Sequence, residues 1–138
     1  MKTFIPFILA SLLCSCAAAN EKKGTSLYKK IKARITYYYP QKPYGKKVSD
    51  KKTKVAQKGI TVAAHPDFKF GTKIIIPALK GKIGDGNFSV QDRGSAVTKK
   101  RAAKGKGYVF DVFVDNKKEM SIMERKTSEW MDVFIVEN

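Results

Sequence analysis

Apolar and polar side chains alternate along most of the chain from residue 31 onward, which is the pattern of strands with one buried face. In IKARITYYY, residues 31–39, one face would carry Ile31, Ala33, Ile35, Tyr37 and Tyr39. Five more segments have strand character: GITVAA, KIIIPAL, FSVQD, YVFDVFV and MDVFIVE. Turn-forming stretches such as PQKPYGKK and GKIGDGN separate them. The pattern predicts a mainly β fold of six short strands.

One short helix is expected between the last two strands. Asn116 followed by Glu119 fits a capping box, and KKEMSIMERK continues the segment. Met120 and Met123 would share one face of this helix, where we expect them to contact the core. Many short strands with one short helix are typical of a small closed or semi-closed barrel.

The start of the chain, residues 1–19, has the features of a secretory signal. Lys2 precedes the apolar run FIPFILASLL, and the small-residue stretch CSCAAAN follows. The apolar run is too short for a convincing membrane span. Cleavage after Ala19 would give a secreted protein. LCSC also resembles a bacterial lipobox, and lipidation of Cys16 would anchor the protein to a membrane, facing the periplasm; this interpretation is favoured over small apolar cysteines in a signal core.

We expect a polar tether over residues 20–30 and a single domain over residues 31–138, acting as a monomer. Both cysteines lie in the predicted signal, so the mature domain has no disulfide. The fold must therefore be held by its own core, which about 120 residues can supply.

The chain is strongly basic, with 28 basic and 12 acidic residues. Loss of the signal removes only Lys2, which leaves 27 minus 12, or a net charge of +15. Residues 42–58 carry seven lysines against Asp50, and residues 99–106 carry five basic residues and no acid. These runs are either solvated loops or a surface for a polyanion. The export signal argues against nucleic acid and favours envelope polyanions such as peptidoglycan carboxylates, anionic surface polymers and anionic lipid.

Asp111 is the carboxylate that is hardest to explain by structure alone. It interrupts the apolar run YVFDVFV, where it needs a partner or an elevated pKa. An elevated pKa is what a general acid needs near neutral pH. Asp115 shares its strand face but lies roughly 13 Å away, too far for a mutual pair. Asp115 is expected to help cap the helix, and Asp92 is the natural partner for Asp111.

Asp92 precedes Arg93 and Gly94 in a turn. It could satisfy backbone amides there, or act in catalysis, or do both. Arg93 or a nearby lysine could instead hold Asp111 ionised, which would make Asp111 structural.

His65 is the only histidine, so a zinc site is not expected, although His65 could join a hydrogen-bond network at a cleft. The chain has no P-loop and no dinucleotide-binding glycine pattern, and we expect no metal and no cofactor. Tyr37, Tyr38 and Tyr39 could stack on sugars, with Tyr37 and Tyr39 the preferred candidates, although alternation would bury some of the tyrosines. Trp130 is expected in the core.

The order of these segments resembles that of the bacterial three-aspartate (3D) domain and of the related rare lipoprotein A family. ITYYYP resembles their opening strand, and GITVAAHPDFKFGTKIIIP is the most specific piece. VQDRG is similar to the Asp-Arg-Gly of the rare lipoprotein A family, and FDVFVD to the last two aspartates of the 3D pattern. The resemblance covers residues 33–136 and implies a six-stranded double-psi β-barrel.

The resemblance also implies a function. Related barrels in membrane-bound lytic transglycosylase A and in rare lipoprotein A cleave the glycan strands of peptidoglycan without water, closing an anhydro ring on the muramic acid. By position, Asp111 corresponds to the acid/base, Asp92 to its partner in the cleft and Asp115 to the third aspartate. His65 falls where the rare lipoprotein A pattern has histidine. Expansins share the barrel and loosen walls without clear hydrolysis.

The chain departs from the family pattern in two places. Gly94-Ser95 stands where the family has Gly-Gly, and the segment before Asp111 is longer and carries TKKRAAKGKG. With no companion wall-binding domain, the barrel would bind glycan by itself, with its basic loops. We expect a lytic transglycosylase that produces 1,6-anhydromuramic ends. The alternatives are a non-catalytic, expansin-like peptidoglycan-binding module and, less favoured, a small secreted cationic effector or inhibitor.

Overall fold

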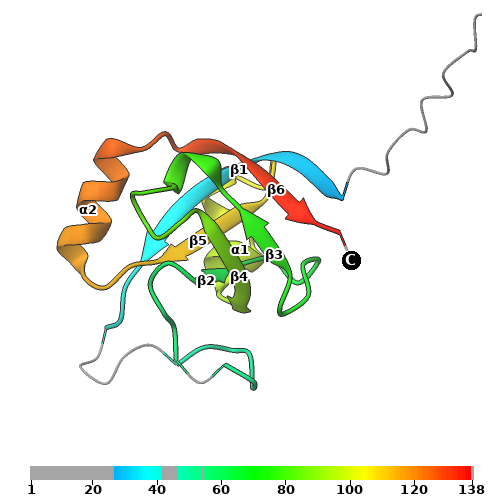
Figure 1. The fold of residues 1–138 in the computed structure, drawn as a ribbon, viewed down its shortest axis with the longest axis horizontal. Coiled ribbons are helices and arrows are strands. Elements are labelled where there is room, and N and C mark those ends of the chain that lie inside the picture. The colour runs from blue at the N-terminus through cyan, green and yellow to red at the C-terminus, as the bar shows by residue number, and fades with distance from the viewer. Residues whose placement is uncertain (1–26, 42–46, 54, 138) are drawn as a thin grey trace, which may run out of the picture.

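The computed structural model describes residues 27–41, 47–53 and 55–137, and Figure 1 shows the arrangement of their elements. The six strands are β1 (Tyr28–Tyr38), β2 (Thr61–Ala63), β3 (Lys73–Ile75), β4 (Asn87–Asp92), β5 (Val109–Phe113) and β6 (Trp130–Val136). The α-helices are α1 (Ser95–Thr98) and α2 (Lys117–Lys126), and the 3₁₀ helices are η1 (Pro77–Leu79) and η2 (Arg101–Ala103). The predicted signal, with Cys16, lies outside the described residues.

The six strands form one sheet in the order β1-β5-β2-β4-β3-β6, and β6 pairs back onto β1. Two of the neighbouring pairs, β1 with β5 and β2 with β4, are parallel, and the other pairs are antiparallel. Both parallel pairs join strands that are not consecutive in the chain. This interleaving brings β1, β2, β4 and β5, which are far apart in sequence, side by side.

The inward faces of the strands build the main core. Ala33, Ile35 and Tyr37 alternate along β1 as buried residues, as the period-two pattern predicts. A second, smaller cluster lies on the outer face of β5, where Val97 and Ala103 cover Val109. The main core covers one face of β5, and α1 and η2 cover the other face. Because both faces are buried, nearly all residues of β5 are apolar.

The mainly β fold with six strands is confirmed. β1 begins at Tyr28, inside the segment for which we expected a tether, and β3 ends before Pro77, which begins η1. The expectation of a single helix is wrong, because α1 also forms. Four residues with no capping side chain leave no periodic pattern by which α1 could be recognised. No helix in the described ranges is long and apolar enough to cross a membrane.

The predicted start of α2 is confirmed. The Asn116 side chain accepts a hydrogen bond from the backbone N–H of Glu119 at 2.9 Å. The Glu119 carboxylate in turn accepts from the backbone N–H of Asp115, also at 2.9 Å. These reciprocal bonds satisfy backbone donors that a helix start leaves free.

Replacing Asn116 by Ala tests this cap. We expect the free energy of unfolding to fall by about 1 kcal/mol, because the Glu119 N–H loses its acceptor. Urea unfolding measures the difference. Asn87→Ala, at an exposed strand position whose side chain caps no helix, is the comparison; an equal loss in both variants would contradict the capping role.

Candidate active site

Strand pairing brings Asp92 and Asp111 to opposite sides of one small residue. Ala63 on β2 pairs with Asp92 on β4 and with Asp111 on β5. The two aspartates are therefore two strand spacings apart, about 10 Å between their Cα atoms. Because Ala63 is small, it leaves a hollow between them. Both aspartates line a cavity of about 230 Å³, together with Tyr38, Ala63, Arg93, Gly94, Ser95, Ala96 and Val97.

Asp92 is a buried carboxylate whose acceptors are already occupied. The Asp92 residue is only 2 % exposed to solvent. One oxygen accepts from the Ser49 N–H at 3.0 Å, the Ser49 hydroxyl at 2.8 Å and the Arg93 N–H at 2.9 Å. The other accepts from the Tyr38 hydroxyl at 3.1 Å. These four donors hold the Asp92 carboxylate in a fixed orientation, with Oδ1 more crowded than Oδ2.

Asp111 has a different environment. Among the described residues, its side chain takes part in one hydrogen bond, which Oδ1 accepts from the Thr36 hydroxyl at 2.9 Å across the β1–β5 pair. Burial raises the pKa of Asp111 to about 6, and the negative charge of Asp92 adds to this, whereas the Thr36 hydrogen bond opposes it. Within the described part of the chain Asp111 forms no ion pair. Asp111 can therefore carry an exchangeable proton close to neutral pH.

Tyr38 joins the two carboxylates to the wall of the cavity. Its hydroxyl donates to Asp92, and its ring meets the edge of Phe113 with centroids 5.4 Å apart. Burial, and after it the charge of Asp92, raises the pKa of Tyr38 well above its usual value. The hydroxyl therefore stays protonated and remains a donor.

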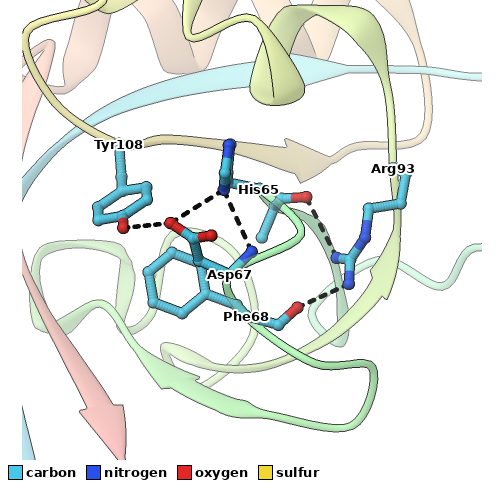
Figure 2. A network of polar contacts seen from close by, with 6 residues as sticks. His65, Asp67, Phe68, Arg93 and Tyr108 are labelled. Carbon is cyan, nitrogen blue, oxygen red and sulfur yellow. Dashed lines mark hydrogen bonds and ion pairs between the residues drawn. The ribbon is translucent and has the colours of Figure 1, made fainter.

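Arg93 does not hold Asp111 ionised. Its guanidinium donates to the carbonyl oxygens of Ala64 at 3.2 Å and Phe68 at 2.6 Å, as Figure 2 shows. It also lies over the ring of Phe70, 4.1 Å from the centroid. Arg93 thus fixes the loop over residues 64–70 beside the cavity, and no cation of the described residues pairs with Asp111.

His65 belongs to a neighbouring polar network, which Figure 2 shows. Its Nδ1 lies 3.1 Å from the backbone nitrogen of Asp67 and 3.2 Å from that residue's carboxylate. The Tyr108 hydroxyl donates to the same carboxylate at 2.6 Å and is the main reason why the pKa of Asp67 is lowered. His65 does not line the Asp92–Asp111 cavity. The described residues contain no group of three or more acidic, histidine or cysteine side chains that could hold a metal ion.

The other predicted site residues lie as follows. Asp115 is exposed just before α2, with its carboxylate 3.7 Å from the Lys58 ammonium, away from the cavity. Tyr37 is buried, and its hydroxyl bonds to that of Thr127 at 2.8 Å. Tyr39 packs against the main core. Gly94 precedes α1 and lines the cavity.

Two residues of the site, Thr36 and Ser49, were not predicted, and Tyr38 was expected only as part of a sugar-stacking surface. Thr36 and Tyr38 share the polar face of β1, opposite Ile35 and Tyr37, so their phase in the strand was a usable indication. Ser49 comes from a polar, lysine-rich stretch, and nothing in its neighbours points to Asp92.

No known protein family matches this chain, and no curated protein has a significantly similar sequence. The resemblance to the 3D and rare lipoprotein A families therefore stays a prediction, and the site is interpreted from its own geometry.

Thr36→Val tests the hydrogen bond to Asp111. Because the hydroxyl stabilises the ionised carboxylate, its removal should raise the pKa of Asp111 above 6. Titration of the Asp111 carboxyl carbon by NMR measures this directly. Thr53→Val, which removes a similar hydroxyl contact with Asp50, should leave the pKa of Asp111 unchanged. A lower pKa in Thr36→Val would contradict the assignment.

Asp111→Asn should stabilise the protein in a pH-dependent way. The pKa of Asp111 rises from 3.8 to about 6 on folding, so the folded state binds more protons between these values. The carboxylate therefore contributes stability below its unfolded pKa and loses it as the pH rises through 6. Near pH 7.5 we expect Asp111→Asn to raise the free energy of unfolding by about 2 kcal/mol, and near pH 4 by almost nothing. Urea unfolding at both pH values measures this; an equal gain at both would show that the carboxylate is not destabilised by ionisation.

Proposed function

We propose that this protein is an exported, envelope-located lytic transglycosylase of peptidoglycan, and that its sheet is a double-psi β-barrel. The two parallel pairs formed by non-consecutive strands support that connectivity. Two observations support the function. The order of the sequence segments resembles that of the family, and the two aspartates that the resemblance assigns to the cleft line one cavity. The strong positive charge suits a substrate that carries carboxylates.

The observation that carries the proposal is the difference between the two aspartates. Asp92 accepts from four donors, whereas among the described residues Asp111 accepts from Thr36 alone. The environments of Asp111 and Asp92 are thus unequal, which is how paired carboxyl groups take different roles in catalysis. Asp111, with a pKa of about 6, is the proton donor and acceptor of this site.

The reaction follows from one mobile proton. Protonated Asp111 gives its proton to the glycosidic oxygen as the bond from that oxygen to the anomeric carbon of the muramic acid breaks. The resulting carboxylate then takes the proton from the sugar's own C6 hydroxyl, whose oxygen bonds to the anomeric carbon. A 1,6-anhydro ring closes, the other glycan fragment leaves with a free hydroxyl, and Asp111 is protonated again. No water is consumed.

Asp92 and Tyr38 support this step without exchanging protons. The fixed charge of Asp92 favours the protonated form of Asp111 and would stabilise positive charge that develops on the sugar. The Tyr38 hydroxyl and the Ser49 contacts hold that charge in place.

The same difference argues against hydrolysis. Hydrolases of glycosides normally use two active carboxyl groups, one as an acid and one as a base or nucleophile. A base needs a free lone pair toward a water molecule, and a nucleophile needs one toward the sugar. Asp92 is poorly placed for either role, because three donors occupy Oδ1, the Tyr38 hydroxyl binds Oδ2 and the residue is only 2 % exposed.

Digestion of purified sacculi tests the function. The mature protein is incubated with intact and with amidase-stripped sacculi, and the products are analysed by mass spectrometry. We expect 1,6-anhydromuramic ends from at least one of the two substrates. Hydrolysed reducing ends would contradict the ring-closure mechanism, and no new ends on either substrate would contradict the enzyme.

The second candidate is a non-catalytic, expansin-like wall binder. The sizes of the cavities favour this candidate. The cavity at Asp111 measures about 230 Å³, whereas a larger cavity of about 560 Å³, with room for more of a ligand, lies elsewhere. A binder would retain sacculi without releasing products, and Asp111→Asn would bind them as the wild type does.

A further inference from the structure

A cavity larger than the one at Asp111 lies outside the site described above. It is a groove of about 560 Å³ on the outer side of β1 and β6, between η1 and the C-terminal end of α2. We call it the Trp130 groove. The residues that give it its character are Lys32, Lys82, Lys126, Trp130, Asp132 and Phe134.

Trp130 is a surface residue, and the expectation that it belongs to the core is wrong. Along β6 the buried residues are Met131, Val133 and Ile135, which leaves Trp130 on the outer face at 36 % exposure. A side chain at Gly107 would lie 3.2 Å from the indole ring. The absence of a side chain at Gly107 thus lets the indole pack closely against the backbone there, and Trp130 also lines the groove.

The groove combines aromatic surface with cations that have no acidic partner. Asp132 is neutralised by Lys30 and Lys32, whose ammonium groups lie 3.4 and 3.6 Å from it. In the part of the chain that the structure describes, neither Lys82 nor Lys126 forms an ion pair. Lys82 donates only to the carbonyl of Ala78 at 3.1 Å. An aromatic face stacks on the apolar face of a sugar, and free ammonium groups bind carboxylates.

A second cavity adjoins the groove. It measures about 260 Å³ and shares Thr127 and Ser128 with the groove. Thr36 lines it as well, and the Thr36 hydroxyl is the one that bonds to Asp111. Arg34 also lines it, and the Arg34 Nε has no hydrogen-bond partner among the described residues. The groove is therefore next to a cavity whose lining includes Thr36 but not Asp111.

We propose that the Trp130 groove is a glycan-binding site that holds a carboxylate-bearing wall strand away from the point of cleavage, with Trp130 stacking on a sugar and Lys82 and Lys126 binding its carboxylates. The choice of ligand rests on the proposed function. The site itself rests on the exposed indole, the unpaired lysines and the adjoining cavity. The groove would give this domain a contact with the wall that is separate from the point of cleavage.

Binding is measured in the mature Asp111→Asn protein, so that cleavage does not enter the result. Sedimentation with purified sacculi gives the affinity of this parent, of Trp130→Ala, and of Lys82→Gln/Lys126→Gln, in which the indole and its packing are intact. The matched control is Lys51→Gln/Lys52→Gln, which removes two exposed lysines elsewhere. Circular dichroism checks that each variant is folded. Sacculi with amidated carboxyl groups serve as the neutral substrate.

We expect each groove variant to bind about tenfold more weakly than the parent, as for loss of a central contact residue, with the control close to the parent. Amidation of the sacculi should weaken the parent similarly. Equal binding by parent and groove variants would overturn the site. An equal loss in the control would show diffuse charge attraction instead of a site, and indifference to amidation would overturn the role of carboxylates.

Trp130 also supplies a direct reporter, because it is the only tryptophan of the chain. Soluble, uncrosslinked glycan strands titrated into the Asp111→Asn protein should shift its emission to the blue as the indole loses water. An unchanged emission at saturating glycan would overturn the stacking. If the groove binds glycan but the active protein forms no anhydro ends, the proposed reaction fails and this site stands.

Discussion

Asp111→Asn should abolish glycan cleavage while the protein stays folded. Asn keeps the shape of the side chain and can still accept the Thr36 hydrogen bond, but it carries no proton to give or to take back. General acid–base groups contribute roughly 10²–10⁴-fold to rates, and here one group serves both steps. We therefore expect the rate of release of anhydro ends to fall by at least about 10³-fold, measured by quantitative mass spectrometry of digested sacculi.

The comparison that gives this result its meaning is Asp115→Asn. Asp115 also stands in the segment FDVFVD, but it lies outside the cavity and contacts Lys58. It should retain cleavage within about threefold of wild type, in line with a weak surface ion pair. If Asp115→Asn lost as much activity as Asp111→Asn, Asp111 would not be the only acid/base of the site.

Asp92→Ala should produce the largest loss of stability. The substitution removes the acceptor for the Tyr38 hydroxyl, the Ser49 hydroxyl and two backbone N–H groups. Buried donors that lose their acceptor cost about 1–3 kcal/mol each, although water that enters the cavity would satisfy part of them. We expect the free energy of unfolding, measured in urea, to fall by about 3 kcal/mol.

Two variants separate the lost hydrogen bonds from the lost charge. Asp92→Asn keeps one acceptor oxygen for Ser49 and Arg93, and the Tyr38 hydroxyl can turn to accept from the amide, so its loss should be about 1 kcal/mol. Asp132→Ala, at an exposed carboxylate, should stay within about 0.5 kcal/mol of wild type. A similar stability for Asp92→Ala and Asp132→Ala would mean that the buried network contributes little.

Much of the fold and part of the site follow from the sequence, because they depend on local patterns. Alternation separates the buried and exposed faces of β1, and the capping box predicts the start of α2. Asp111 could be singled out because a carboxylate between Phe110 and Val112 needs a special environment. Its raised pKa has the cause expected from that position, which is burial.

The rest depends on contacts between distant segments. Ser49 reaches Asp92 only because the chain over residues 47–53 runs beside β4, where the Asp50 N–H also bonds to the Gln91 carbonyl. The basic run at residues 99–106 appears solvated in sequence, yet η2 within it buries Ala103 against the outer face of β5. Trp130 is exposed because it alternates with the buried residues of β6. The apolar character of its side chain had suggested a core position instead.

The most direct test of the central claim follows the fate of water during cleavage. Wild-type protein digests sacculi in water labelled with heavy oxygen, and mass spectrometry examines the new glycan ends. If Asp111 alone moves the proton and the sugar's own hydroxyl closes the ring, the ends are 1,6-anhydro sugars without the label. Labelled reducing ends would show that water attacks the sugar, and would contradict both the ring closure and the passive role given to Asp92.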